Sequence, residues 1–196
     1  TIDAHQHFWQ LGRKPFDYGW LDAPQNAPIR RNYLPADLKP LIDSVHVDQT
    51  VFVQTQHNLE ENRWVLELAA QNPFIAGVVG WVDLQSPEVG EQLRRFAAHP
   101  KLVGVRHVVQ DEPDDQFMLR PAFLRGLEAL AAFDLAYDLL LFPKHLPQAA
   151  QVVQMFPRQR FVLDHIAKPF IKAGTRAPWD SELRVLARCD NVTCKV

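Results

Sequence analysis

Cysteine is scarce in this sequence. Its 196 residues include two cysteines, Cys189 and Cys194, and these are not spaced as a Cys-x-x-Cys pair. So few thiols in a chain of this length are expected to be reduced and buried rather than joined in a disulfide framework. That state is typical of the cytoplasm, and we expect a cytoplasmic location.

Basic runs and long apolar runs are also absent. The net charge is −2 and no segment is densely populated with lysine or arginine, which argues against a nucleic-acid partner. No apolar stretch approaches the roughly 20 residues that a membrane-spanning helix requires. The first residues lead directly into a strand-like segment with polar histidines, so we expect neither a secretory leader nor a membrane partner.

Hydrophobic residues make up 47% of the chain and charged residues 22%, which is ordinary for a globular protein. Seven segments with strand character alternate with segments whose apolar residues recur at helical spacing. The predicted strands are 2–8, 50–54, 75–83, 102–109, 135–141, 160–165 and 191–196. The sequence predicts that one helix starts after Asn58. Asn58 can act as its N-cap, and the Glu61 side chain can bond back to the N-cap in a capping box.

The spacing of these strands predicts the fold class. Most steps from strand to strand are about 25–33 residues, the length of one βαβ unit. Such a series predicts an α/β protein and, within that class, a (β/α)8 barrel of the TIM type. Seven strands are one fewer than this barrel contains, and 196 residues fall below its typical length of about 250. We therefore expect residues 1–196 to be a single barrel domain, apparently truncated after strand seven and lacking its C-terminal part.

The first connection differs from the others. Residues 10–34 contain three prolines and several aromatic residues and show no helical periodicity. Long irregular connections in compact domains are commonly functional lids or binding loops. We expect this loop to lie over the active site.

The strongest chemical signal is the pair His5 and His7 in the first predicted strand. Residues i and i+2 of a strand point to the same face, so both imidazoles enter one space. Burying two imidazoles is costly unless their nitrogens are used. A metal ion, a substrate oxygen or a proton transfer would each use them.

Polar residues recur at the ends of the predicted strands, where the mouth of a barrel would gather them. They are His57, Trp81, Asp83, Arg106, His107, Tyr137, Asp138, Asp164 and His165. Arg106 lies within an apolar strand, and a buried arginine needs an anionic partner. Alternation lets only one of Asp164 and His165 face the interior, and we expect that residue to be His165, with Asp164 structural. For the lone histidines, the tryptophan and the tyrosine, a purely structural role is the competing interpretation.

Three segments resemble the amidohydrolase superfamily: 3–9 (DAHQHFW), 104–107 (GVRH) and 163–169 (LDHIAKP). The resemblance runs the length of the chain. Within this superfamily, the segments resemble more specifically the amidohydrolase-2 branch. That branch includes sugar lactonases of the L-fuconolactonase and L-rhamnonolactonase type and 2-pyrone-4,6-dicarboxylate lactonase. The resemblance implies a (β/α)8 barrel that hydrolyses the lactone ring of a sugar acid, with a small sugar lactone as its partner.

The resemblance also implies catalytic roles for three histidines, His5 and His7 on strand one and His165 on strand six. The same three suit neutral-nitrogen ligation of one divalent metal ion such as zinc. Members of the branch work with one metal ion or with none, and both remain open for this chain. A binuclear site is not expected, because Arg106 and His107 occupy the strand-four position at which many binuclear members carry a carboxylated lysine.

Substrate binding is expected of four residues, namely Arg106, His107, Trp81 and Tyr137. The first two match the strand-four pair that lies at the substrate in the family, and the other two follow from their positions at strand ends. The family also has an aspartate after strand eight that acts as general base or metal ligand. No counterpart precedes Val196, so the resemblance implies a longer enzyme.

Three other readings of the function remain open. The branch includes metal-dependent decarboxylases, which release carbon dioxide instead of opening a lactone. A non-catalytic barrel would bind a sugar acid without turnover, and an inactive fragment would have no activity at all.

Overall fold

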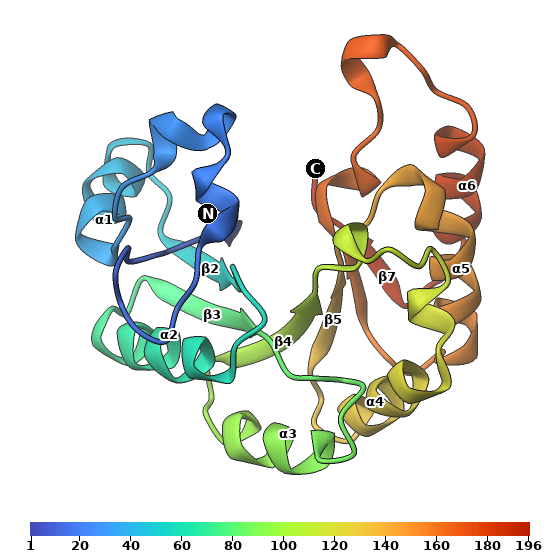
Figure 1. Ribbon diagram of the computed structural model, residues 1–196, viewed down its shortest axis with the longest axis horizontal. Coiled ribbons are helices and arrows are strands. Elements are labelled where there is room, and N and C mark those ends of the chain that lie inside the picture. Colours follow the sequence, from blue (N-terminus) through green and yellow to red (C-terminus); the bar gives the residue numbers. More distant parts are fainter. The chain divides into compact units, whose positions relative to one another are not determined.

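The computed structural model describes all 196 residues and shows seven strands alternating with six α-helices (Figure 1). The strands are β1 (Ile2–Gln6), β2 (Gln49–Val53), β3 (Ile75–Gly80), β4 (Leu102–His107), β5 (Ala136–Leu139), β6 (Phe161–Leu163) and β7 (Val192–Cys194). The α-helices are α1 (Pro35–Ser44), α2 (Leu59–Gln71), α3 (Val89–Ala97), α4 (Pro121–Ala131), α5 (Leu146–Met155) and α6 (Trp179–Leu186). The short 3-10 helices are η1 (Gly19–Asp22), η2 (Pro24–Ile29), η3 (Val109–Asp111), η4 (Phe117–Leu119), η5 (Pro143–His145), η6 (Asp164–Ala167) and η7 (Ile171–Ala173). None of the helices combines the length and apolar character needed to cross a membrane.

The strands follow one another in sequence order along a single sheet, β1 to β7. The pairs β1–β2, β2–β3, β4–β5, β5–β6 and β6–β7 are all parallel. Parallel neighbours joined by helical crossovers confirm the predicted α/β class, and their order is that of consecutive strands in a TIM-type (β/α)8 barrel.

All seven predicted strands exist, but all except β2 are shorter than predicted. The apolar runs continue beyond the ends of the strands into buried turns, as at Val82, Val109 and Leu141. A continuous buried run carries no signal for the residue at which the hydrogen-bonded ladder stops. The polar residues predicted to lie on the last part of a strand therefore often lie in the turn that follows it.

The chain divides into two compact units. The first unit comprises Thr1–Trp81 and Ala98–Val103, and the second comprises Val82–Ala97 and Gly104–Val196. The chain passes between the units three times, and the last of these boundaries, between Val103 and Gly104, falls within β4. That residues 1–196 act as one barrel domain stays a prediction.

In the first unit, α2 packs against β3 and buries Trp64 and Val65. The predicted N-cap is confirmed, because Asn58 Oδ1 accepts the backbone N–H of Glu60 at 2.9 Å. The predicted capping box is wrong. The Glu61 side chain is buried and accepts the backbone N–H of Thr55 at 3.1 Å instead of turning back to the cap.

Residues 10–34 form a loop that includes η1 and η2, which the sequence pattern did not predict. Trp9 and Tyr33 close the base of this loop by exchanging backbone hydrogen bonds of 3.1 and 3.0 Å. Phe16 is buried in the loop, with its ring 5.3 Å from that of Trp64 on α2. The loop is thus anchored within the first unit, and its predicted position over an active site stays a prediction.

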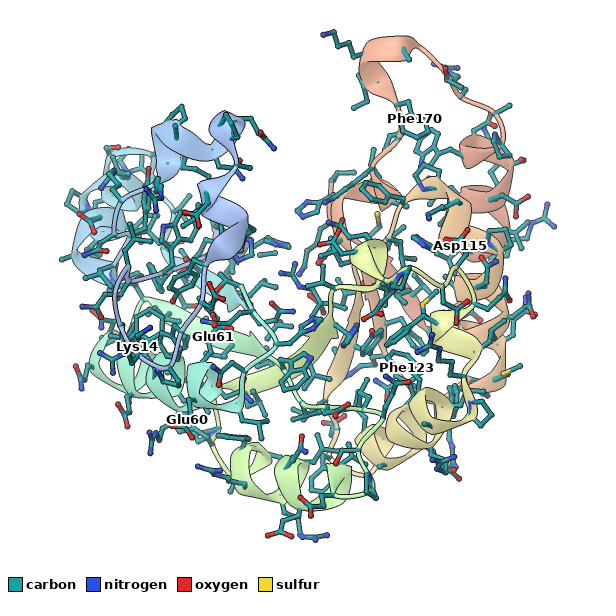
Figure 2. The ribbon with its side chains drawn as sticks, in the orientation of Figure 1. Lys14, Glu60, Glu61, Asp115, Phe123 and Phe170 are labelled. Atoms are coloured by element: carbon teal, nitrogen blue, oxygen red, sulfur yellow. The ribbon has the colours of Figure 1, made fainter.

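The core of the second unit is aromatic where α4 covers the sheet. Phe123, labelled in Figure 2, lies edge-on to Tyr137 of β5 with ring centroids 5.8 Å apart, and Tyr137 lies edge-on to Phe161 of β6 at 6.2 Å. Gly126 lets α4 approach the backbone closely. A Cβ atom at Gly126 would lie 2.1 Å from the carbonyl oxygen of Leu84, so only glycine fits at this crossing.

Candidate active site

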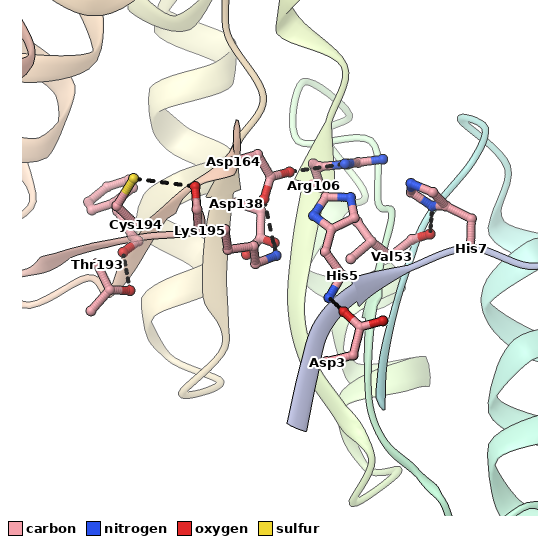
Figure 3. A network of polar contacts seen from close by, with 11 residues as sticks. Asp3, His5, His7, Val53, Arg106, Asp138, Asp164, Thr193, Cys194 and Lys195 are labelled. Atoms are coloured by element: carbon pink, nitrogen blue, oxygen red, sulfur yellow. Dashed lines mark hydrogen bonds and ion pairs between the residues drawn. The ribbon is translucent and has the colours of Figure 1, made fainter. Parts of the chain in front are cut away.

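The two strand-one histidines lie side by side in the first unit (Figure 3). β1 ends at Gln6, so His5 belongs to the strand and His7 follows it. Their ring centroids are 4.9 Å apart with the planes at 79°. The prediction that both imidazoles share one space is confirmed, although the ladder with β2 shifts its register between Asp3 and Gln6.

The orientation of His7 is fixed by the neighbouring strand. Its Nδ1 lies 2.7 Å from the carbonyl oxygen of Val53 at the end of β2. Because a carbonyl oxygen only accepts, Nδ1 carries the proton, and in the neutral ring the lone pair is on Nε2. Metal-binding histidines characteristically hold their second nitrogen in this way. The pair therefore fits the donor chemistry of a divalent metal ion.

An aromatic platform stands at the ends of β2 and β3. The His57 ring stacks on the Trp81 indole with centroids 5.3 Å apart and planes at 12°. The backbone of Trp81 is held by the buried side chain of Asn62, which accepts its N–H at 2.9 Å and donates to its carbonyl oxygen at 2.6 Å. Aromatic surfaces at strand ends are common components of ligand sites, and substrate binding by Trp81 stays a prediction.

α2 of the same unit carries a buried carboxyl group, that of Glu61. Glu61, labelled in Figure 2, accepts hydrogen bonds from both the backbone N–H and the hydroxyl of Thr55. Burial raises the pKa of Glu61 to about 7, although its hydrogen bonds with Thr55 and Gln56 lower it. Burial also raises the pKa of Tyr18, in the 10–34 loop, to about 12, and the charge of Glu61 adds to that rise.

Four charged residues of the second unit form a continuous chain of ion pairs (Figure 3). Arg106 Nη1 is 3.0 Å from Asp164 Oδ2, and Asp164 Oδ1 is 3.1 Å from Lys195 Nζ. Lys195 Nζ is also 2.5 Å from Asp138 Oδ2. The side chains are nearly excluded from solvent, with 5% of Arg106, 1% of Asp138, 0% of Asp164 and 14% of Lys195 exposed. We call these four residues the ion-pair chain.

The strand register explains why these side chains meet. Arg106 and Asp138 are partners in the pairing of β4 with β5, so they project from the same face of the sheet. Val162 and Thr193 continue that row on β6 and β7. Asp164 and Lys195 each follow two residues later and return to the same face.

The ion-pair chain is neutral, with two cations and two carboxylates. Burial raises the pKa of Asp138 to about 6, the negative charge of Asp164 adds to the rise, and Lys195 opposes it. Asp164 is the anionic partner that a buried Arg106 requires. The expectation that Asp164 supports the structure is consistent with this position.

His165 does not lie on a strand, which corrects the alternation argument. β6 ends at Leu163, and residues 165–168 have φ values between 46° and 56°. This left-handed region is unfavourable for residues other than glycine. The turn leaves the His165 side chain exposed, while Asp164 is buried. Strained backbone of this kind is concentrated at functional sites.

Hydrogen bonds hold the left-handed turn in place. The N–H of Ile166 donates to the carbonyl oxygen of Lys195 at 3.1 Å, and the Trp179 indole N–H donates to the carbonyl oxygen of Ile166 at 2.7 Å. Lys168, the last residue of the turn, donates from Nζ to Gln110 Oε1 at 2.6 Å. These contacts fix where the turn presents its side chains.

His107 and Tyr137 lie on the opposite face of the sheet from the ion-pair chain. The His107 ring stacks on Phe117 at 4.7 Å, and its Nε2 lies 2.6 Å from the Glu112 carboxylate. Burial lowers the pKa of His107 against the opposing effect of Glu112. Tyr137 is fully buried against Phe123. Both rings are packed among core side chains, which favours structural roles over the predicted substrate binding.

The sequence reasoning missed the part that Asp138 and Lys195 play. Asp138 was noted only as a polar residue near a strand end, and Lys195 was not noted. A signal was present, because each is a charged residue inside a predicted apolar strand, as Arg106 is. Such residues need partners of opposite sign, so Asp138 and Lys195 could have been marked as members of a buried ion pair, although charge alone does not say which residues meet.

Comparisons with known proteins agree with the fold. The model of the amidohydrolase family matches residues 2–196. An L-fucono-1,5-lactonase of Burkholderia ambifaria is 40% identical over 195 residues, covering 100% of this chain and 66% of that protein. An L-fucono-1,5-lactonase of Burkholderia multivorans is 36% identical, covering 100% of this chain and 67% of that protein.

A solved structure shows the same similarity to amidohydrolases. The crystal structure of a Burkholderia multivorans amidohydrolase with bound zinc has a TM-score of 0.89 and 36% sequence identity, covering 98% of this chain and 68% of its own. The present chain thus spans about two thirds of the length of its relatives. The match of the family model to nearly every residue and the parallel order of the strands lead to one conclusion: the chain belongs to the amidohydrolase family.

Proposed function

We propose that the protein hydrolyses the lactone ring of a sugar acid. The observation that carries this proposal is the 40% identity, over the whole of this chain, to a protein named L-fucono-1,5-lactonase. The polar groups at the strand ends supply chemistry of the required kind. The proposal concerns the whole protein, since the relatives are longer than this chain.

Lactone hydrolysis requires a water nucleophile, polarisation of the ester carbonyl and a proton for the departing alkoxide. In the proposed roles, His5, His7 and His165 polarise the carbonyl group or move the proton. Arg106 binds a substrate oxygen or carboxylate, for which a guanidinium is suited. Trp81, stacked on His57, supports the sugar ring.

One divalent metal ion fits the histidines of this chain. His7 holds its Nδ1 proton on Val53 and has its lone pair on Nε2, which is the arrangement of a zinc ligand. His5 and His7 of the first unit would hold the ion, and His165 as a further ligand stays a prediction from the family resemblance. When bound, it would act as a Lewis acid on the lactone carbonyl. The zinc in the related B. multivorans amidohydrolase supports this assignment.

A pH-indicator screen of sugar-acid lactones tests the proposal on the full-length protein, with and without a chelator. We expect acid release from at least one lactone. If activity is lost with the chelator and returns with zinc, the metal assignment is supported. If the chelator leaves activity unchanged, the enzyme does not need a metal ion and that assignment is withdrawn.

The same screen distinguishes the alternative functions when carbon dioxide and ligand binding are measured in parallel. Release of carbon dioxide from an unsaturated or aromatic acid without lactone opening would replace the proposal with a decarboxylase. Binding of sugar acids with no turnover would replace it with a binding protein.

A further inference from the structure

The ion-pair chain is costly to bury, which raises the question of what it does. Desolvation of buried ions offsets most of their attraction, so buried ion pairs give little net stability. Here two carboxylates and one cation are at most 5% exposed. Their presence on the face that carries Arg106 points to a role in the site.

Lys195 is the member of the chain that links the others. Its ammonium contacts both carboxylates, at 2.5 Å from Asp138 and 3.1 Å from Asp164. Its backbone is fixed as well, because its N–H donates to the carbonyl oxygen of Leu163 at 2.8 Å and its carbonyl oxygen accepts from Ile166. Both the backbone and the side-chain ammonium of Lys195 are therefore held in place.

Asp164 is held from two sides. One carboxylate oxygen contacts Lys195 Nζ and the other contacts Arg106 Nη1. A carboxylate with both oxygens engaged cannot rotate freely, so it presents a fixed acceptor to the guanidinium. Lys195 thus contacts the carboxylate that also binds Arg106, and Asp164 lies between the two cations.

We propose that Lys195 is a positioning residue that orients Arg106 for substrate binding by fixing the Asp164 carboxylate between them. The proposal rests on the proposed function in one respect, the role of Arg106 in binding substrate. Removal of Lys195 leaves two buried carboxylates for one cation and frees one side of Asp164. Arg106 then loses its fixed orientation, while the groups assigned to the chemical step are unchanged.

The test compares Lys195→Met with Lys195→Arg in the full-length protein. The arginine variant keeps a cation with several hydrogen-bond donors for the two carboxylates. It should therefore keep Asp164 fixed, whereas the methionine variant should not. Lys172→Met is the matched control, because Lys172 is exposed and lies outside the ion-pair chain. A double variant, Lys195→Met with Asp138→Asn, removes one cation and one carboxylate together and keeps the chain neutral.

Two readouts are measured. In steady-state kinetics, we expect Lys195→Met to raise KM about tenfold with kcat changed less than about twofold. In nitrogen-15 NMR, we expect rotation of the Arg106 guanidinium to become at least about threefold faster. Lys195→Arg and Lys172→Met should resemble the wild type in both. The double variant should show the faster rotation even if Lys195→Met does not fold.

The outcomes separate this proposal from the proposed function. Unchanged Arg106 rotation in the double variant overturns the positioning role, whatever the protein hydrolyses. Faster rotation in a protein that opens no sugar lactone supports the positioning role and refutes the lactonase. A fall in kcat with unchanged KM would also overturn the inference, because it would place Lys195 in the chemical step.

Discussion

The side-chain amide of Asn62 bonds to both polar groups of the Trp81 backbone, accepting its N–H at 2.9 Å and donating to its carbonyl oxygen at 2.6 Å. Asn62 lies on α2 and Trp81 follows β3, so one buried side chain ties helix, strand end and aromatic platform together. The first unit depends on this link for the position of Trp81.

Asn62→Ala should therefore destabilise the protein. It leaves two backbone groups without this partner, at a cost of about 2–4 kcal/mol in the free energy of unfolding. Asn26→Ala is the matched control, because its amide donates to Trp20 in an exposed loop, and it should cost less than about 1 kcal/mol. Chemical denaturation measures both. Equal losses of stability in the two variants would show that the hydrogen bonds of Asn62 contribute no more than those of an exposed asparagine.

Two helical glycines should respond in opposite directions to alanine. Gly126→Ala places a Cβ atom 2.1 Å from the Leu84 carbonyl oxygen, so we expect it to lower the free energy of unfolding by at least about 2 kcal/mol. In Gly90→Ala the nearest atom is 3.6 Å away, so alanine should stabilise α3 by about 0.5–1 kcal/mol. Thermal unfolding of the two variants checks the contrast. Stabilisation by Gly126→Ala would contradict the close approach of α4 to Leu84.

Stability should fall with rising pH because of Glu61. Burial raises its pKa from 4.5 to about 7. Below pH 4.5 the carboxyl is protonated in both states and contributes no pH dependence. Between pH 4.5 and 7 the unfolded chain loses the proton while the folded chain keeps it, which lowers the free energy of unfolding by about 3 kcal/mol in total.

Denaturation of the wild type and Glu61→Gln at pH 5 and pH 8 measures this effect. Glutamine cannot ionise, so the variant should lose much less stability over this interval, whatever its absolute stability. Parallel pH dependence in the two proteins would show that Glu61 ionises as readily when folded as when unfolded.

His165→Asn in the full-length protein should remove most lactone hydrolysis and leave the fold intact. The His165 side chain is exposed on its turn, so its replacement should change the free energy of unfolding by less than about 0.5 kcal/mol. Activity is measured with the lactone identified by the screen, and stability by thermal unfolding. Unchanged turnover would remove His165 from the catalytic set.

The parts of the site that follow from local geometry could be predicted from the sequence. The shared space of His5 and His7 needs only the two-residue period of a strand. The need of Arg106 for an anion follows from an arginine in an apolar run. The identity of that anion does not, because Asp164 is 58 residues away and is brought there by the strand register.

The conformation after β6 could not be predicted either. Residues 165–168 are histidine, isoleucine, alanine and lysine, none of which signals a left-handed backbone. Hydrogen bonds from distant residues, including Trp179, impose that conformation. The two-residue alternation of a strand therefore does not extend to His165, and Asp164 rather than His165 is buried.

The bridge between Trp9 and Tyr33 joins the two ends of the 10–34 loop to each other. The bridge therefore sets the distance between the end of the strand before the loop and the start of the helix after it, whatever the length of the loop. The entropic cost of lengthening such a closed segment grows only with the logarithm of its length. Exposed positions of the loop can therefore accept additional residues while β1 and its histidines stay in register, provided that Phe16 keeps its buried place against Trp64.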